Sequence, residues 1–454
     1  MTKTLFGTDG IRGVPGTPPL DDATLYAMGR ALGRYLARGR TGHGGIGAGG
    51  RVLIGMDTRE SGPHLAALIA AGLAETAAEP EFAGVITTPG VACLVRQKDF
   101  QAGVVISASH NPYHDNGVKL FSHAGMKFPD AAEKELERDI ARLRAEPAPA
   151  NPPPLRAERV YDEEYLVFLR ALVLPGAQLK GLRMVLDCAN GAASEIAPEL
   201  FRSLGADVVA IHNQPDGRNI NAGCGSLHLK SLQEAVVAQR AALGVAFDGD
   251  ADRALFASAT GQQVNGDAVL LAAARYLKSQ GRLKGNRVVA TTMSNLGLER
   301  ALVAEGIALA RVAVGDRYVL EEMLRAGNVL GGEQSGHIIF LEDSPAGDGL
   351  LTAVKIASLV ALDGSLEKLV AGLKDYPQVI LNVKVRTKPP LDSLPEVSRV
   401  LAAAKAALGD NGRIVLRYSG TEELARVMVE AECHADVQHW SESLATALRN
   451  CIGA

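Results

Sequence analysis

The sequence predicts an α/β protein of several domains that ends in a smaller α+β domain. Short β-branched runs alternate with Ala- and Leu-rich amphipathic segments along most of the chain, as expected for α/β units. The chain has 454 residues, and because a domain usually holds about 100–200 residues, three or four domains are expected. Residues 379–385 alternate in polarity like an antiparallel strand, which sets the C-terminal part apart.

The expected strands are short apolar runs bounded by turn-forming residues, at residues 51–57, 103–107, 183–187, 207–211, 244–248 and 287–291. The expected helices are longer segments with apolar residues at helical spacing, at residues 22–38, 63–78, 131–144, 229–241, 266–280 and 294–305. Together they account for the alternation of strands and helices.

Breaks in this pattern suggest domain boundaries. The proline-rich residues 146–154 hold neither a helix nor a strand ladder and indicate a linker. A new helix begins near Gly266, and Tyr376-Pro377 precedes the antiparallel strand. The predicted domains are residues 1–154, 155–258, 259–374 and 375–454. The glycine-rich residues 40–50 are expected to be a surface loop, because no Gly-Lys-Ser/Thr phosphate-loop motif follows them.

Composition and charge exclude several kinds of partner. Lys and Arg number 47 against 51 Asp and Glu, a net charge of −4, so neither a nucleic acid nor an anionic membrane is expected. No apolar run approaches the ~20 residues of a bilayer span, and the first residues lack the apolar region of a signal peptide. The five cysteines are widely separated, which favours reduced thiols in a cytoplasmic protein.

A serine loop lies at the carboxyl end of the strand expected at residues 103–107. It reads Ser107-Ala-Ser-His-Asn-Pro112, and its proline forces a turn, because a residue before proline is kept out of the helical region. A nucleophile at the end of a strand in an α/β sheet faces the usual ligand crevice, so Ser109 is a candidate nucleophile. The alternative is a turn serine that bonds its own backbone.

Three aspartates, Asp248, Asp250 and Asp252, stand within five residues at the end of another expected strand. Their carboxylates repel one another unless a cation neutralises them, and oxygen ligands separated by Gly and Ala suit Mg²⁺. An EF-hand calcium loop is excluded, because Arg253 and Ala259 occupy the positions where it needs Gly and Glu. A solvated acidic turn is the alternative.

Two further loops carry polar groups, the first of them after a strand expected at residues 413–417. Hydroxyl, amide and guanidinium groups that could cradle a dianion come from Arg417, Ser419, Gly420 and Thr421, with Arg426 following. A hairpin with a surface arginine is the alternative.

The other loop spans residues 331–337. Glu333 and Ser335 are two residues apart and could point into one cleft, while His337 could titrate near neutral pH. A plain glycine-rich turn is the alternative for this loop.

Taken in their order along the chain, the four loops resemble those of the α-D-phosphohexomutase family over essentially the whole chain. The resemblance includes Phe6-Gly-Thr-Asp-Gly-Ile-Arg-Gly13 and Asn116-Gly-Val-Lys119. Ser-Ala-Ser-His-Asn-Pro at residues 107–112 is similar to the glucosamine branch of the family, whereas the mannose/glucose branch typically has Thr-Gly-Ser-His-Asn-Pro. In the last loop the glucosamine branch often has Arg-Lys-Ser-Gly-Thr-Glu-Pro, where this chain has Arg417-Tyr-Ser-Gly-Thr-Glu-Glu423. Loss of the lysine charge at Tyr418 and of the rigid proline at Glu423 is expected to weaken phosphate binding or to alter the mobility of the last domain.

The resemblance implies three related α/β domains with mixed sheets and a smaller C-terminal α+β domain around a central cleft. It implies a phosphoserine at Ser109 and one Mg²⁺ per chain, held by Ser109, Asp248, Asp250 and Asp252. Sugar contacts are implied for Glu333 and Ser335. The non-reacting phosphate would be held by Arg417, Ser419, Gly420 and Thr421, joined by Arg426.

The reaction implied is the interconversion of glucosamine-6-phosphate and glucosamine-1-phosphate, an isomerisation that feeds UDP-N-acetylglucosamine and cell-wall precursor synthesis. Glucosamine 1,6-bisphosphate or glucose 1,6-bisphosphate would be the activating intermediate. Lys119, Arg12 and Arg253 are expected to stabilise charge, Lys119 is preferred over His337 as general acid/base, and His110 is expected to shape the serine loop.

The expected partner is a small phosphosugar, and a homodimer is considered as the assembly. The nearest alternative is the same chemistry on glucose or mannose phosphate. A catalytically silent sugar-phosphate binder and a Mg²⁺ phosphatase are alternatives from other functional classes.

Overall fold

The computed structural model describes residues 5–7, 9–40, 50–419 and 423–454. The chain divides into two compact units, which we call unit 1 (Met1–Gly285 and Gly315–Ala371) and unit 2 (Asn286–Val314 and Gly372–Ala454). The four domain boundaries stay a prediction, and most of the glycine-rich loop at residues 40–50 lies outside the described residues. Within the described ranges, no helix is both long and apolar enough to cross a membrane.

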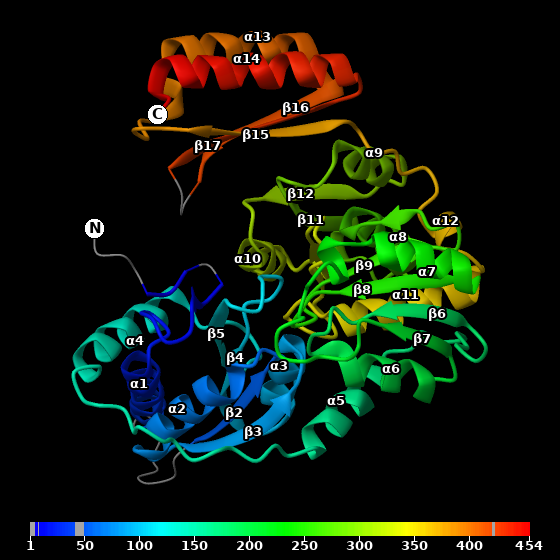
Figure 1. Ribbon diagram of the computed structural model, residues 1–454. Coiled ribbons are helices and arrows are strands. Elements are labelled where there is room, and N and C mark those ends of the chain that lie inside the picture. The colour runs from blue at the N-terminus through cyan, green and yellow to red at the C-terminus, as the bar shows by residue number, and fades with distance from the viewer. Residues whose placement is uncertain (1–4, 8, 41–49, 420–422) are drawn as a thin grey trace. The chain divides into compact units, whose positions relative to one another are not determined.

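The first sheet of unit 1 has the strand order β1-β5-β4-β2-β3 (Figure 1). Its parallel strands β2, β4 and β3 are joined by β5, which runs antiparallel to β4 and β1. The strands are β1 (Ile11–Gly13), β2 (Arg51–Met56), β3 (Glu79–Val85), β4 (Phe100–Ile106) and β5 (Asn116–Ser122). Its helices are α1 (Asp22–Arg40), α2 (Gly62–Ala74), α3 (Thr88–Gln97) and α4 (Asp130–Leu143).

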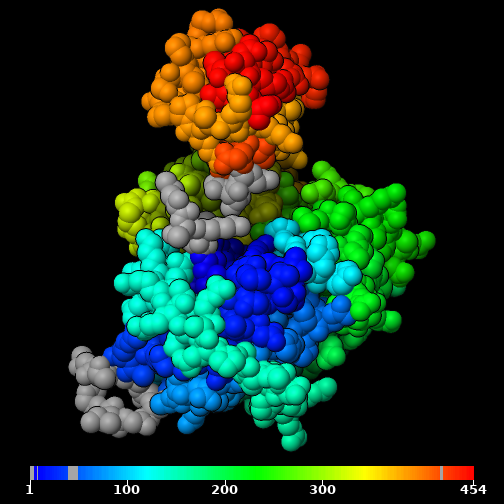
Figure 2. All heavy atoms as spheres, turned by 60° about the vertical axis from the view of Figure 1, so that its left-hand side comes forward, coloured from blue at the N-terminus to red at the C-terminus, as the bar shows by residue number. Residues whose placement is uncertain are grey.

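Apolar residues cover both faces of this sheet, because successive side chains of a strand point to opposite sides. Val52 and Ile54 of β2 belong to the core shared with α1, α2 and α4, whereas Leu53 packs with α3. In Figure 2 the N-terminal part of the chain (blue) lies beside the α4 region (cyan). Arg38 of α1 joins these helices through ion pairs to Glu135 and Asp139 at 2.6 and 2.9 Å.

The second sheet of unit 1 has the order β10-β9-β8-β6-β7. Strand β6 is parallel to β7 and β8, and β9 is antiparallel to β8 and β10. The strands are β6 (Arg183–Asp187), β7 (Asp207–Ile211), β8 (Leu243–Phe247), β9 (Ala254–Ser258) and β10 (Gln263–Val264). The helices packed around it are α5 (Val160–Arg170), α6 (Ala193–Ser203), α7 (Lys230–Gln239), α8 (Gly266–Ser279) and α11 (Gly349–Asp363). Unit 1 also holds α10 (Asp316–Ala326), α12 (Leu366–Leu369) and the hairpin of β13 (Leu330–Gly332) and β14 (Ile338–Phe340).

Unit 2 contains an antiparallel sheet with the order β15-β17-β16, which confirms the strand predicted near residues 379–385. Its strands are β15 (Gln378–Lys384), β16 (Gly412–Tyr418) and β17 (Leu424–Ala431), and its helices are α13 (Pro395–Leu408) and α14 (His434–Ile452). The unit also includes the parallel pair β11 (Arg287–Thr291) and β12 (Ala308–Val312), with α9 (Leu296–Ala304) between them in sequence.

The expected elements are all present, and a side chain explains the difference at two of the helix ends. Helix α2 ends at Ala74 and not at residue 78, because the Thr76 hydroxyl donates to the Leu73 carbonyl at 2.6 Å and takes over a terminal helix acceptor. Helix α9 begins at Leu296 and not at residue 294, because Asn295 caps it by accepting from Gly297 N at 2.9 Å. The five cysteines, all in the described part of the chain, are free thiols.

Candidate active site

Strand β4 carries the serine loop at its carboxyl end. Ser109 is buried and its φ is +53°, a left-handed conformation that is uncommon for a residue other than glycine. Its hydroxyl donates to Oδ2 of Asp248 at 2.7 Å, and its N–H donates to Oγ of Ser107 at 2.9 Å. The turn therefore directs a serine hydroxyl at a carboxylate that lies 139 residues further along the chain.

The aspartate loop (residues 248–252) follows β8. The carboxylates of Asp248, Asp250 and Asp252 are buried, and one oxygen of each lies within 4.8 Å of the others. Oδ1 of Asp250 and Oδ1 of Asp252 have no hydrogen-bond partner among the described residues. Burial, together with Asp252 and Asp250, raises the pKa of Asp248. Unsatisfied, crowded carboxylate oxygens are the donor set that a hard divalent cation would complete.

Lys119 contacts this loop from β5, where it pairs with Val105 of β4. Its Nζ donates to Oδ2 of Asp250 at 2.8 Å and lies 3.5 Å from Oδ2 of Asp252 and 3.6 Å from Oδ2 of Asp9. Burial alone would lower the pKa of Lys119, but Asp250, Asp9 and Asp252 raise it well above its usual value. The residue is therefore a buried ammonium at neutral pH.

Lys119 belongs to a closed ring of alternating charges, which we call the charge ring: Asp252, Lys119, Asp9, Lys127, Asp316 and His337. Lys127 Nζ lies 2.6 Å from Oδ1 of Asp9 and 2.7 Å from Oδ2 of Asp316. His337 closes the ring, with Nε2 3.7 Å from Asp316 and Nδ1 3.8 Å from Asp252. Burial would lower the pKa of His337, but Asp252 and Asp316 raise it, which favours the imidazolium.

Two arginines lie at the edge of the serine loop. Arg12 donates to Oδ1 of Asn111 at 3.2 Å and forms an ion pair with Asp9. Arg253 Nη1 lies 3.1 Å from Nδ1 of His110. Burial and the cations of Arg253 and Arg12 lower the pKa of His110 to about 4, so a neutral imidazole accepts this hydrogen bond.

The glycine-rich loop between β13 and β14 is closed by backbone hydrogen bonds, from Glu333 N to His337 O at 2.9 Å and from Gly336 N to Glu333 O at 3.0 Å. Oε1 of Glu333 accepts from Gly315 N at 3.1 Å, which links this loop to the start of α10. Ser335 is exposed. The loop therefore presents a hydroxyl to solvent beside the buried His337.

The arginine loop of unit 2 lies between β16 and β17. Arg417 and Arg426 are direct cross-strand partners. Burial and the charge of Arg426 lower the pKa of Arg417. Two adjacent guanidinium groups are unfavourable on a sheet unless an anion joins them, which makes this pair a candidate anion site.

The tip of the same hairpin is only partly described. Ser419 N donates to Leu424 O at 2.8 Å, while Gly420 and Thr421 lie outside the described residues. The Tyr418 hydroxyl donates to Pro389 O at 2.7 Å, and Lys388 Nζ donates to Ser419 O at 3.2 Å. Lys388 also pairs with Glu423 at 3.3 Å, so it contacts this loop through both a carbonyl and a carboxylate.

Unit 1 brings together most of the residues that the sequence singles out. Lys119 and His337 contact Asp250 and Asp252, and Ser109 contacts Asp248. Arg253 joins the two groups, because its N–H donates to Oδ1 of Asp248 and its Nε lies 3.8 Å from Oδ1 of Asp252. The arginine loop belongs to unit 2 and is a separate constellation.

Several residues of the network were not predicted. Asp9 lies in the Phe6–Gly13 motif but was given no role, Lys127 has no distinguishing pattern around it, and Thr88 is at the start of a helix. Arg59 and Asp316 could have been predicted from their positions. They follow the carboxyl ends of β2 and β12, and ligands of α/β sheets bind at such ends.

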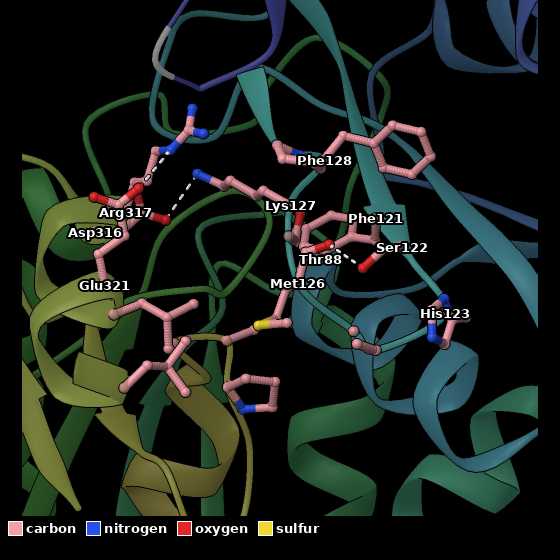
Figure 3. A pocket seen from close by; sticks show the side chains of 18 of the residues that line it. Thr88, Phe121, Ser122, His123, Met126, Lys127, Phe128, Asp316, Arg317 and Glu321 are labelled. Carbon is pink, nitrogen blue, oxygen red and sulfur yellow. Dashed lines mark hydrogen bonds and ion pairs between the residues drawn. The ribbon is translucent and has the colours of Figure 1, made fainter. Parts of the chain in front are cut away.

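A cavity of about 1050 Å³ opens within unit 1 beside the charge ring. Figure 3 shows Lys127 reaching toward Asp316, with Arg317 paired to Glu321 alongside. The other walls of the cavity include Phe121, Met126 and Phe128. The cavity thus meets the aspartate loop at Asp252, a member of the charge ring.

Comparison with protein families covers nearly the whole chain. Residues 3–146, 163–261 and 265–376 match the models for α/β/α domains I, II and III of phosphoglucomutase/phosphomannomutase. Residues 380–447 match the C-terminal domain of the same proteins. This sequence of matches confirms the predicted fold class of three related α/β domains and a smaller last one.

Curated relatives are similar along the full length. The chain is 54% identical over 454 residues to a phosphoglucosamine mutase of Solibacter usitatus, covering 100% of both chains. It is 50% identical to that of Koribacter versatilis, over 99% of this chain and 98% of the relative.

Solved structures share the fold at low identity. A phosphoglucomutase/phosphomannomutase family protein from Burkholderia thailandensis has a TM-score of 0.79 at 23% identity, covering 99% of this chain and 98% of that one. An Aspergillus fumigatus N-acetylphosphoglucosamine mutase, solved with GlcNAc-6P and magnesium, has a TM-score of 0.67 at 18% identity, over 98% and 95% of the two chains.

Proposed function

We propose that this chain, which belongs to the phosphoglucomutase/phosphomannomutase family, interconverts glucosamine-6-phosphate and glucosamine-1-phosphate. The observation that carries the proposal is the hydrogen bond from the Ser109 hydroxyl to Asp248, which joins a strained serine to three buried carboxylates. The choice of glucosamine rests on the full-length similarity to phosphoglucosamine mutases.

The proposed metal is one Mg²⁺ per chain, held by Asp248, Asp250 and Asp252 together with an oxygen on Ser109. Two of these carboxylates have a buried oxygen with no partner in the described ranges, and oxygen-only ligands suit Mg²⁺. When bound, the cation would polarise the phosphoryl group and offset its negative charge.

The proposed reaction uses Ser109 as a phosphate carrier. In the first transfer the P–Oγ bond of phosphoserine breaks, a bond forms from phosphorus to the free sugar hydroxyl, and the proton of that hydroxyl is taken up by the protein. The product, glucosamine 1,6-bisphosphate, turns over, and Ser109 takes back the other phosphoryl group. Glucose 1,6-bisphosphate could start the cycle by the same transfer.

Positive charge around the transfer comes from Lys119, Arg12 and Arg253. The raised pKa of Lys119 keeps it as an ammonium, which suits stabilisation of the transferring group. His337, held between Asp252 and Asp316, is likewise favoured in its protonated form. The preference for Lys119 over His337 as general acid/base stays a prediction.

Binding of the rest of the substrate is assigned to the other two loops. Glu333 and Ser335 would contact sugar hydroxyls in both orientations of the intermediate. The second phosphate would be held by Arg417, Ser419, Gly420, Thr421 and Arg426. The cross-strand arginine pair supports this role, because a dianion would neutralise both charges.

The test combines substrate comparison with detection of the carrier. We expect kcat/KM to be highest for glucosamine-6-phosphate when it is compared with glucose-1-phosphate and mannose-1-phosphate. Intact-mass measurement should find one phosphate on the wild-type chain and none on Ser109→Ala, which should be folded and without turnover. A higher kcat/KM for glucose- or mannose-1-phosphate would overturn the sugar assignment, and turnover by Ser109→Ala would overturn the carrier assignment.

A further inference from the structure

The left-handed backbone of Ser109 needs support from its surroundings, because a serine does not favour this conformation. Two carbonyl groups of the serine loop, those of Ser109 and Asn111, supply the points of attachment. Each accepts hydrogen bonds from the same two side chains, which come from different sheets of unit 1.

The first side chain is Arg59. Its Nη2 donates to Ser109 O at 3.0 Å and to Asn111 O at 2.8 Å, and its Nη1 donates to Pro112 O. The guanidinium is fully buried and its Nε donates to Oδ2 of Asp57 at 2.9 Å. Arg59 is therefore committed to holding the serine loop and leaves no donor facing solvent.

The second side chain is Asn221, from the loop that follows β7 in the second sheet. Its Nδ2 donates to Ser109 O at 2.9 Å and to Asn111 O at 3.1 Å. Asn221 is itself left-handed, with φ +58°, and its N–H donates to Ala189 O at 2.9 Å. Through these contacts, the loop after β7 fixes the backbone of Ser109 relative to the second sheet.

Gly249 of the aspartate loop leaves the space in which Asn221 contacts the carbonyl of Ser109. A Cβ added at Gly249 would lie 2.5 Å from Ser109 O and 2.9 Å from Nδ2 of Asn221. Both distances are shorter than van der Waals contact, so only glycine fits beside the hydrogen bond from Asn221 to Ser109. The serine carbonyl, Asn221 and the aspartate loop therefore meet at one point.

We propose that Arg59 and Asn221 are positioning residues for phosphoryl transfer: they clamp the carbonyls of Ser109 and Asn111 and so aim the phosphate of Ser109. The inference rests on the proposed function. Asn221 touches neither the hydroxyl of Ser109 nor an aspartate carboxylate among its described hydrogen bonds, so its effect must pass through the backbone. Misplacing a reacting group by about 1 Å can lower a rate about 100-fold without weakening substrate binding.

The decisive variant is Asn221→Gly, because glycine keeps the left-handed backbone and removes only the clamp. We expect kcat to fall about 10- to 100-fold, with KM within about twofold of wild type. Asn221→Asp has nearly the same shape but turns an acceptor toward two carbonyl oxygens, so its kcat should fall further. The matched control is Asn286→Gly, which changes an exposed left-handed asparagine in unit 2 and should leave both constants unchanged.

The phosphoenzyme provides the second readout. Glucose 1,6-bisphosphate is mixed with dephosphorylated enzyme, and the appearance of phosphate on Ser109 is followed by intact mass; it should be slowed in Asn221→Gly and Asn221→Asp and not in Asn286→Gly. Near-UV circular dichroism and the thermal midpoint establish that each variant is folded.

The outcomes separate the two proposals. If wild type turns over and Asn221→Gly keeps its kcat and its phosphorylation rate, the clamp is not a positioning device. A rise in KM at constant kcat also contradicts it. Wild-type enzyme that neither turns over a hexose phosphate nor accepts phosphate would overturn the proposed function and this inference with it.

Discussion

Thr88 and Asp250 are joined by two hydrogen bonds. The Thr88 hydroxyl donates to Oδ2 of Asp250 at 2.5 Å, and the Thr88 N–H donates to the main-chain oxygen of Asp250 at 3.0 Å. Thr88 is the first residue of α3, which packs on the first sheet. A residue of the first sheet's helices thereby orients a carboxylate of the aspartate loop, as partners of metal ligands commonly do.

Replacing Thr88 with Val should weaken metal binding while preserving side-chain shape. The carboxylate of Asp250 would lose the hydroxyl that orients it, and we expect the Mg²⁺ concentration for half-maximal activity to rise about tenfold or more. Thr88→Ser retains the hydroxyl and is the control. Equal Mg²⁺ curves for Thr88→Val and wild type would show that this hydrogen bond does not tune the metal site.

Lys127→Met should disrupt the charge ring, because Asp316 would lose its closest cation and Asp9 would lose one of its three cations. Burial alone would raise the pKa of Asp9, and Lys119, Lys127 and Arg12 lower it, so loss of Lys127 destabilises the carboxylate. Breaking a partly buried pair should cost up to about 3 kcal/mol. We expect a lower thermal midpoint and a reduced kcat/KM.

The control for this substitution is Lys98→Met, which removes an exposed lysine paired with Glu164 at 2.7 Å. Exposed ion pairs contribute little, so its thermal midpoint and kcat/KM should match wild type. Similar losses in both variants would mean that the ring has no special importance.

His212 should make stability depend on pH. Its contact with the buried Asp187, at 3.1 Å, raises its pKa. Because the folded-state pKa lies above the unfolded value of about 6.5, the stabilisation is fully present below that pH and is lost as pH rises through the folded-state pKa. The difference in thermal midpoint between wild type and His212→Asn should therefore be larger at pH 6 than at pH 9, by roughly 2 °C.

Asparagine suits this substitution because His212 has φ +47°, which asparagine tolerates. His64→Asn, at a half-exposed pair with Asp22, is the control and should show little difference at either pH. A pH-independent gap for His212→Asn would contradict a role for its protonation.

Arg413→Met should destabilise unit 2 by leaving Glu430, which is fully buried, without its cation. Arg413 contacts Oε2 of Glu430 at 2.8 Å and also donates to Thr292 O and Ser294 O. Removing one partner of a buried pair costs about 3–5 kcal/mol. Chemical unfolding followed by Trp440 fluorescence would measure this loss.

The double variant Arg413→Met/Glu430→Gln should recover part of that stability. The glutamine side chain would be neutral, and its oxygen could still accept from Leu296 N, as Glu430 does at 3.0 Å. If the double variant is no more stable than Arg413→Met, the lost stability comes from the hydrogen bonds of Arg413 to the two carbonyl groups and not from the unpaired carboxylate of Glu430.

The secondary structure was largely predictable from local patterns. Strands β6, β7 and β11 have the predicted bounds, because their apolar runs are interrupted abruptly by polar residues or glycine. Helix ends were less predictable where a side chain such as Thr76 or Asn295 competes for the terminal backbone groups.

The site was predictable only as separate loops. Ser109, the aspartates and Lys119 stood out by sequence context, but their convergence depends on strand order, which a single sequence does not specify. Arg59 shows the remaining difficulty: an isolated arginine is usually exposed, and only the fold reveals that it is fully buried against two carbonyl groups.

The charge ring is itself electroneutral. With His337 protonated, its three cations balance its three carboxylates. Beside it, Arg253 lies 3.8 Å from Asp252, and burial with Asp252 and Asp250 raises the pKa of Asp248. A divalent cation would favour the ionised form of Asp248 and add positive charge, and a phosphoserine of charge roughly −2 would add the negative charge that offsets it. Cation and phosphoryl group should therefore strengthen each other's binding, so that the enzyme holds its metal most tightly when it is charged with phosphate.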